Sequence, residues 1–396
     1  MNSLTFRIAT AVLTFVIGVG VATAWVFKQA QPSIEPVELA TSSATLEMVF
    51  VLDTTGSMGG LLEGAKQRIW GIVNEVMQSS SQPSVRVGLV AYRDRGDQYV
   101  TQVLPLTDDL DKVYTTLMDY QAAGGGDAPE DVRRALADGV ARAGWSKSSQ
   151  QLAQIIFLVG DAPPHNDYSD EQDTLITASV AVQQGMVVNT IQCGTSNETK
   201  QVWESIAQHG KGQYFAIPQN GGVQTIATPY DEQLSQLGTK LGSTYVAYGG
   251  GAGAEGERHR GNAKVMADSL ESSVAASAPA EAKAERSINK AINSRAYIGD
   301  LLQNIENGST KLDSVKDEDL PSDLRKLSAS DRKTEITRRL EERAKLRADI
   351  TALSKQRDEF ISDERKKRVA AGSPESGFDV AVSSALKKQV EKKGIK

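Results

Sequence analysis

Three short stretches of the sequence carry acids and hydroxyls that could bind a divalent cation. The first is Asp53-Thr54-Thr55-Gly56-Ser57, which directly follows the apolar run 48–52. Alternate residues of an extended chain point to the same side, so one carboxylate and two hydroxyls (Asp53, Thr55 and Ser57) can converge. All three are hard oxygen ligands of the kind that Mg²⁺ prefers. The alternative interpretation is that these side chains cap the helix that follows them.

The second and third stretches add further carboxylates. Asp127 and Glu130 follow a run of three glycines, and Asp161 follows the apolar run 154–160. Mg²⁺ takes six oxygen ligands and usually keeps several waters, so this set would leave a position open for an incoming carboxylate. The alternatives are that Asp127 caps a helix and that Glu130 is a solvated carboxylate in its first turn.

Strand and helix patterns alternate from residue 45 to residue 248 and must position these side chains. Short apolar runs predict strands over 46–52, 85–92, 99–104, 154–160, 186–192 and 214–217. Helical spacing predicts helices over 61–77, 109–120, 129–143, 170–184, 200–208 and 222–241. The alternation predicts an α/β domain with a doubly wound, mostly parallel, Rossmann-like sheet. Sites in such sheets form at the carboxyl ends of the strands, where the first and third stretches lie.

The three stretches on this α/β pattern resemble the von Willebrand factor type A domain and its metal-ion-dependent adhesion site. The resemblance covers roughly residues 45–245, about half of the chain. Asp53, Thr55 and Ser57 match the D-x-[ST]-x-S signature of the family, and Asp161 matches the acid after its fourth core strand. The resemblance implies a bound Mg²⁺, Mn²⁺ or Ca²⁺ and a protein partner that supplies an acidic residue.

The second stretch departs from the commonest pattern of that family, which places a metal-binding threonine there. Asp127-Ala128-Pro129-Glu130 is instead similar to the D-x-P-E loop of integrin β-subunit inserted domains. That similarity implies that Glu130 is a ligand of the central cation and that Asp127 helps to hold an auxiliary one. The acids that follow the first motif in integrin β subunits are replaced here by Gly59-Gly60.

The N-terminal 28 residues are predicted to be a membrane segment. An apolar run over 8–27, between Arg7 and Lys28, is long enough to cross a bilayer as one helix. Ala22-Thr23-Ala24 also fits a signal-peptide cleavage site, so release after cleavage near Ala24 is the alternative. The polar stretch 29–44 is predicted to be a tether. Either interpretation places the rest of the chain outside the cytoplasm, in the periplasm or at the cell surface.

Net charge and cysteine content limit which kinds of protein this chain can be. The net charge of −6 is mild and argues against a general nucleic-acid binder. The single cysteine, Cys193, excludes an intrachain disulfide and lies in an apolar stretch, where a buried thiol is expected. An exported chain without a disulfide is typical of a bacterial-type protein.

The C-terminal part has a different composition. Residues 249–284 are rich in Gly, Ala, Ser and charge, and are predicted to be a flexible linker. Residues 285–396 are predicted to be an α-helical region whose longest helix runs from about 330 to 368. A thin apolar stripe along that helix suggests a coiled coil, but Arg357 interrupts it. A second helical unit, or an arm that binds the domain or a partner, fits better.

The sequence therefore predicts a membrane-tethered module that binds a protein through a divalent cation and is not an enzyme. A metal-dependent hydrolase is one alternative, although no general base lies near the motif apart from the ligands themselves. The other alternative is a structural protein in which the cation only stabilises the fold.

Overall fold

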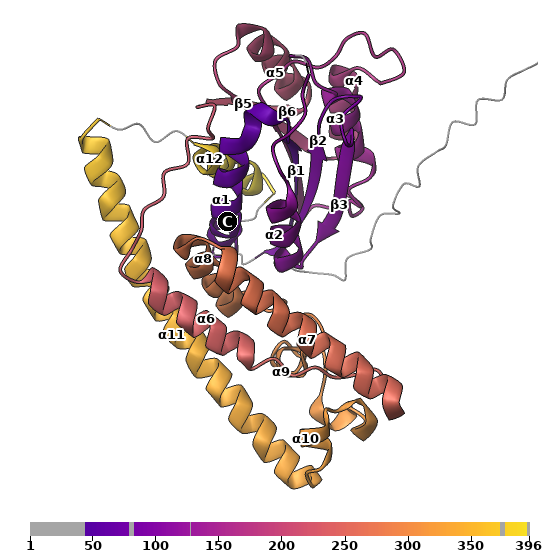
Figure 1. Cartoon of the computed structure of the whole chain (residues 1–396), viewed down its shortest axis with the longest axis vertical. Coiled ribbons are helices and arrows are strands. Elements are labelled where there is room, and N and C mark those ends of the chain that lie inside the picture. The colour runs from indigo at the N-terminus through magenta and orange to yellow at the C-terminus, as the bar shows by residue number, and fades with distance from the viewer. Residues whose placement is uncertain (1–43, 79–82, 127, 373–376, 394–396) are drawn as a thin grey trace, which may run out of the picture. The chain divides into compact units, whose positions relative to one another are not determined.

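The computed structural model describes residues 44–78, 83–126, 128–372 and 377–393. Within them a six-stranded sheet has the strand order β3-β2-β1-β4-β5-β6 (Figure 1). The strands are β1 (Thr45–Asp53), β2 (Ser84–Tyr92), β3 (Thr101–Thr107), β4 (Leu152–Gly160), β5 (Val187–Cys193) and β6 (Lys211–Ile217). Only β3, at one edge, runs antiparallel to its neighbour. The predicted α/β fold with a mostly parallel sheet is confirmed.

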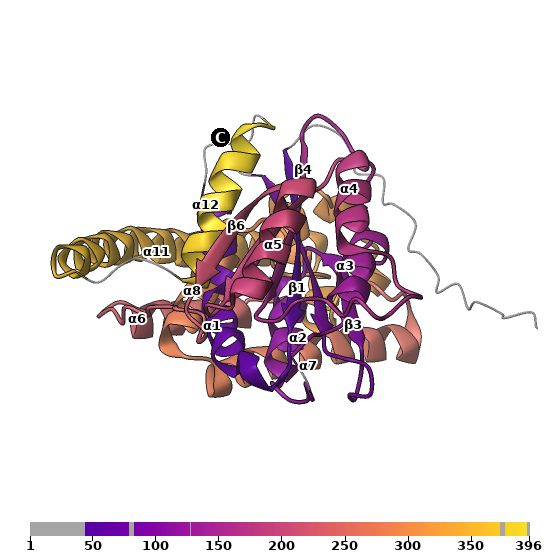
Figure 2. The same ribbon diagram turned by 90° about the horizontal axis from the view of Figure 1, so that it is seen from above.

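Helices cover both faces of the sheet because its central strands are apolar on both sides. Along β1, Met48 and Phe50 belong to one buried cluster, and Val49 and Val51 belong to the other. The first cluster lies under α1 (Gly59–Met77), α2 (Leu110–Asp119) and α12 (Phe378–Glu391). The second lies under α3 (Val132–Ala141), α4 (Thr174–Gln183) and α5 (Asn197–His209). Figure 2 shows α1 and α12 on one side of the strands and α3 and α4 on the other.

The strand order reverses between β1 and β4, because the chain builds outward from β1 in one direction and from β4 in the other. Asp53 is the last residue of β1, and Asp161 directly follows β4. The reversal therefore places these two acids at the crevice where open α/β sheets bind their ligands.

The last helix of the chain belongs to this sheet, although the predicted domain ended at residue 248. Phe378 of α12 is 1% exposed, and its ring lies 5.8 Å from that of Phe50 in β1. Near the other end of α12, Gln389 and Asn189 exchange side-chain hydrogen bonds of 2.6 and 3.1 Å. Helix α12 thus covers the sheet beside β6 and α1 (Figure 2).

The predicted closing helix over 222–241 is wrong in its bounds and its position. The observed helix, α6, spans Asp231–Ser243. Its buried residues Leu234 and Leu241 cluster with Ile288 of α8 (Ala280–Ile292) and Ile350 of α11 (Ala329–Ala370). Because α6 packs on these helices and not on the strands, the sheet face beside β6 is left to α12.

Residues 249–284 do not form the predicted flexible linker. They contain the 25-residue helix α7 (Gly253–Ser277) and the first turn of α8. Arg260 of α7 is 3% exposed and donates hydrogen bonds to the main-chain oxygens of Gly249, Gly251 and Glu318. The alanines in this stretch also favour helix, and the buried arginine fixes the preceding glycine-rich turn against the 317–319 turn.

The remaining helical region packs through buried charges as well as through apolar side chains such as Ile350 and Leu353. It contains α9 (Leu301–Glu306), α10 (Ser322–Arg325), and short 3-10 turns over Leu312–Ser314 and Asp317–Asp319. In α11, Arg357 is 1% exposed and forms ion pairs of 2.7 Å with Asp231 of α6 and with Glu285 of α8. The arginine that interrupts the apolar stripe is therefore itself a packing contact.

Helix α8 joins this helical region to the sheet domain. The side-chain amide of Asn74 in α1 donates to the Glu285 carbonyl at 2.8 Å and to its carboxylate at 2.9 Å. Arg286 of α8 pairs with Asp111 of α2 through contacts of 2.6 and 2.8 Å. The sequence left open whether the C-terminal region binds the domain or a partner, and in the structure it packs on the domain.

None of the helices in the described ranges is long and apolar enough to cross a membrane. The predicted membrane segment over 8–27 lies outside these ranges, as does the predicted tether except for its last residue.

Candidate functional site

The first predicted loop is folded around Asp53 as it leaves β1. Asp53 is fully buried, and its Oδ1 accepts hydrogen bonds from the Thr55 main-chain N at 2.8 Å and from the Thr55 hydroxyl at 2.6 Å. The Thr55 and Ser57 hydroxyls lie 3.5 Å apart. Neither the following 3-10 turn, Gly56–Met58, nor α1 receives a side-chain cap. The helix-capping interpretation of this motif is therefore wrong, and its three oxygen-bearing side chains are grouped.

Main-chain hydrogen bonds hold the three loops together. The Gly56 N–H donates to the Gly124 carbonyl at 3.2 Å, which joins the first loop to the second. Glu130 donates from its N–H to Pro163 at 3.0 Å and accepts from the His165 N–H at 3.1 Å, which joins the second loop to the third. Residues far apart in the sequence thus meet at one end of the sheet, as the strand order requires.

Glycines allow the acidic side chains to approach the loops closely. A Cβ atom at Gly125, where φ is +76°, would lie 2.9 Å from Glu130 Oε1 and 3.0 Å from Thr55 Cβ. The Glu130 carboxylate and the Thr55 side chain therefore both lie about 3 Å from the same point. At Gly160, a Cβ would lie 3.1 Å from Asp53 Oδ2, which places that oxygen against the end of β4.

Glu130 is buried, which contradicts its interpretation as a solvated first-turn carboxylate. It is 4% exposed, and it precedes α3, whose N-cap is the neighbouring residue Asp131. Two buried carboxylate oxygens, Glu130 Oε2 and Asp53 Oδ2, have no hydrogen-bond partner among the described residues. Buried polar atoms without a hydrogen-bond partner are uncommon in folded proteins.

The electrostatics of the loops agree with this geometry. Burial raises the pKa of Asp53 to about 7, and the nearby charge of Asp161 adds to this rise. Burial also raises the pKa of Glu130 to about 9, with a further contribution from Asp53. The charge of Asp161 thus adds to the effect of burial on the pKa of Asp53, and the charge of Asp53 adds to it on the pKa of Glu130. A cation bound among them would reverse this effect by stabilising the ionised forms.

The remaining predicted residues differ in exposure, and the structure adds one residue that was not predicted. Ser57 is exposed and Asp161 is half-buried, so the set faces solvent on their side. Asp127, the predicted auxiliary ligand, lies outside the described residues. Gln219 was not predicted, but its side-chain amide donates to Asp161 Oδ2 at 2.6 Å. It lies two residues beyond β6, at the carboxyl end of a strand, but the rule that sites form there does not single out a glutamine.

The oxygen atoms grouped in these loops come from hydroxyls as well as from carboxylates. In the ranges that the structure describes, no group of three or more His, Cys, Asp or Glu side chains could hold a metal ion on its own. The acids alone therefore do not form such a group, and a cation held here would also need the hydroxyls of Thr55 and Ser57. Hydroxyl and carboxylate oxygens fit Mg²⁺, Mn²⁺ or Ca²⁺ and do not favour softer metals.

Comparison with known proteins places this arrangement in a family. Residues 47–229 match the family model described as von Willebrand factor A domain. These residues form a von Willebrand factor A domain. The match includes most of β1, all of β2 to β6 and the three candidate loops, and it confirms the family on which the sequence resemblance rested. Domains of this family generally mediate protein–protein interaction.

Individual relatives of the domain are distant. An ariadne-like RING finger protein of Acanthamoeba polyphaga mimivirus is 26% identical over 146 residues, which is 34% of this chain. The match spans only 13% of the length of that protein. The crystal structure of the SpRpn10 VWA domain matches with 16% identity and a TM-score of 0.33 over 46% of this chain and 92% of its own.

A second solved structure, proximal thread matrix protein 1 from the mussel byssus, matches with 12% identity and a TM-score of 0.32. The match covers 45% of this chain and 43% of the mussel protein's chain.

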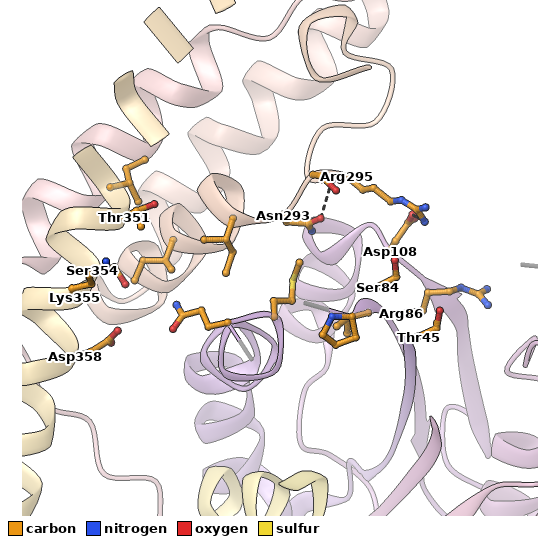
Figure 3. Close-up of a pocket in the computed structure, with 18 residues that line it drawn as sticks. Thr45, Ser84, Arg86, Asp108, Asn293, Arg295, Thr351, Ser354, Lys355 and Asp358 are labelled. Carbon is orange, nitrogen blue, oxygen red and sulfur yellow. Dashed lines mark hydrogen bonds and ion pairs between the residues drawn. The ribbon is translucent and has the colours of Figure 1, made fainter. Parts of the chain in front are cut away.

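A cavity of about 700 Å³ lies at the opposite end of the von Willebrand factor A domain from the candidate site. Figure 3 shows Ser354 and Lys355 of α11 on one side of it and Thr45, Ser84 and Arg86, at the amino ends of β1 and β2, on the other. Arg86 is already paired with Glu47 at 2.5 Å. The cavity contains none of the predicted site residues.

Proposed function

We propose that this von Willebrand factor A domain binds a divalent cation, Mg²⁺ or in its place Mn²⁺ or Ca²⁺, and through it an acidic side chain of a protein partner. The main support is the pair of buried carboxylate oxygens, Asp53 Oδ2 and Glu130 Oε2, that lack hydrogen-bond partners among the described residues. Buried charges in proteins are normally paired or bound to metal, because an isolated buried charge is very costly.

The ligands proposed for the cation are the five residues that the sequence predicted: Asp53, Thr55, Ser57, Glu130 and Asp161. When bound, the cation would supply a positive centre whose remaining coordination positions can take water or a carboxylate. The exposed Ser57 marks the side from which a partner can approach. Asp127 remains the candidate for an auxiliary cation.

We further propose that the protein is a binding protein and not an enzyme, and that it works outside the cytoplasm. The proposed anchor is the apolar run 8–27, with release after cleavage near Ala24 as the alternative. These proposals rest on the sequence alone.

The cation site is tested by calorimetric titration of the full chain, kept soluble with detergent, with Mg²⁺, Mn²⁺ and Ca²⁺. We expect binding to be lost in Asp53→Asn and in Glu130→Gln. Asp167→Asn is the matched control, because Asp167 follows Asp161 in the same loop and is 75% exposed. Circular dichroism establishes that each variant is folded. A folded wild type that binds none of the three cations would overturn the proposal, as would unchanged binding in both site variants.

The partner-binding role is tested with an array of peptides that carry a central Asp or Glu, each beside its Asn or Gln counterpart. We expect some acidic peptides to be retained in Mg²⁺ and released by chelator, while their amide counterparts are not retained. Equal retention of acid and amide peptides would contradict a role for the partner's carboxylate. Turnover of a generic phosphate or ester substrate that disappears in Asp53→Asn would instead favour a hydrolase.

A further inference from the structure

Gln219 bridges two of the three candidate loops although it belongs to neither. It lies in the segment 218–222 that follows β6, where the sequence offered no candidate ligand. Its Nε2 donates to Asp161 Oδ2 at 2.6 Å and lies 3.4 Å from the main-chain oxygen of Ser57. One amide therefore connects the loop after β4 with the loop after β1.

Main-chain contacts hold the segment that carries this exposed side chain. A Cβ atom at Gly194, where φ is +80°, would lie only 2.4 Å from Gln219 Oε1, so glycine is needed for the side chain to lie there. The Gly194 N–H donates to the Ile217 carbonyl at 2.9 Å, which ties the end of β5 to the end of β6. Phe378 at the start of α12 donates from its N–H to the Gly221 carbonyl at 2.9 Å. The segment is thus held from β5 and from α12.

The bond to Gln219 limits what Asp161 can offer to a cation. A free carboxylate can bind a cation through one or both of its oxygens, and an amide N–H that occupies one oxygen favours binding through the other. The amide carries no charge and does not titrate near neutral pH, so it orients Asp161 without adding a ligand. Partners that orient metal ligands in this way commonly have measurable effects on the metal site.

We infer that Gln219 is a positioning residue of the cation site, which keeps Asp161 to a single oxygen ligand and so preserves a coordination position for the partner's acid. This inference rests on the proposed function, because it requires a cation beside Asp161. It gives the segment after β6 a role in the site that neither the motif nor the family signature assigns to it.

The test uses Mn²⁺ alone as the probe with the full chain in detergent. Electron paramagnetic resonance gives its affinity, and water-proton relaxation gives the number of waters on the bound ion. In Gln219→Ala the freed second oxygen of Asp161 competes with water, so we expect about one water fewer on bound Mn²⁺. Gln219→Leu keeps most of the side-chain volume but lacks the donor, and should show the same loss. A merely structural role would not change the hydration of the ion.

Asn220→Ala is the matched control, because Asn220 lies in the same segment and its side chain accepts from the Gly222 N–H at 3.1 Å without contacting Asp161. It should retain the wild-type number of waters. If the wild type binds Mn²⁺ and both Gln219 variants keep the same number of waters, the inference is wrong and the proposed function stands. If the folded wild type binds no Mn²⁺, both are wrong.

Discussion

Replacement of Phe378 by alanine tests whether the last helix of the chain is part of the domain core. Phe378 is 1% exposed, and its ring lies 5.8 Å from Phe50 of β1, the central strand that ends at Asp53. Truncation of a buried phenylalanine to alanine typically costs about 3–5 kcal/mol. Because domains are stable by only about 5–15 kcal/mol, this loss would be a large fraction of the free energy of unfolding.

The single cysteine provides a local assay. Cys193 of β5 is 1% exposed and belongs to the same buried cluster as Phe378. Its labelling by a thiol reagent reports how often the region under α12 opens. A loss of about 3 kcal/mol in the opening free energy should accelerate labelling about a hundredfold, because each 1.4 kcal/mol is about tenfold. Urea unfolding of the same variant should show a matching decrease in stability.

Val380→Ala is the control, because Val380 lies on the same helix but is 37% exposed. A substitution at such a site should change the free energy of unfolding by about 0.5 kcal/mol or less and leave the labelling rate nearly unchanged. The reasoning is refuted if Phe378→Ala stays within about 1 kcal/mol of the wild type and labels Cys193 at the wild-type rate. That result would mean that α12 is not packed on the sheet in solution.

Two further predictions concern buried charges. Arg357→Met should lower the free energy of unfolding by about 3–5 kcal/mol in urea titrations, because it leaves Asp231 and Glu285 buried without their partner. Arg338→Met, on the same helix but with an exposed side chain paired to Glu335, should lower the stability far less, and equal effects of the two substitutions would contradict the packing described. In chelator, the stability of the wild type should fall as pH rises from about 4 toward 7 and above. Over this window the folded state retains protons on Asp53 and Glu130 that the unfolded state releases, because their pKa values are raised to about 7 and about 9. Thermal unfolding at pH 5 and pH 8 measures the difference in the free energy of unfolding, which should be of the order of a few kcal/mol. This difference should be smaller in Asp53→Asn, and Mg²⁺ should offset it. A wild type that is equally stable at both pH values would rule out the buried ionisable pair.

The sheet and its site-bearing loops could be predicted because their signals are local. The continuous apolar run 46–52 identifies a strand buried on both faces, and the acids after it and after 154–160 must lie at the carboxyl ends of parallel strands. Gln219 could not be selected in the same way, since a glutamine two residues after a strand has no chemical signature of its own. Its role depends on the strand order, which places β6 beside β5 and hence near Asp161.

The C-terminal part was predicted less well because its partners are distant in sequence. In α12 the buried residues Phe378, Val382, Ala385 and Leu386 have helical spacing, so the helix itself is readable, but nothing local indicates that it packs on β1. In the sequence, Arg357 only interrupts an apolar stripe. Its role becomes clear from its partner Asp231, which lies 126 residues away in the sequence. The composition of residues 249–284 led to a wrong prediction. Glycine and serine suggested a linker, but alanine and a buried arginine stabilise a helix there.

These contacts determine which part of the chain can be tested for cation binding. The family match ends at residue 229, yet α12 covers the sheet from residue 378 onward, and α8 packs on α1 through Glu285. A fragment that stops near residue 248 would lack both helices and would expose Phe50 together with the apolar side of β4 and β5. It would also lose the hydrogen bond from Phe378 to Gly221, two residues from the amide that contacts Asp161. Absence of cation binding in such a fragment would therefore reflect an incomplete core, so a chain that retains α8 and α12 is needed to decide whether Asp53, Glu130 and Asp161 hold an ion.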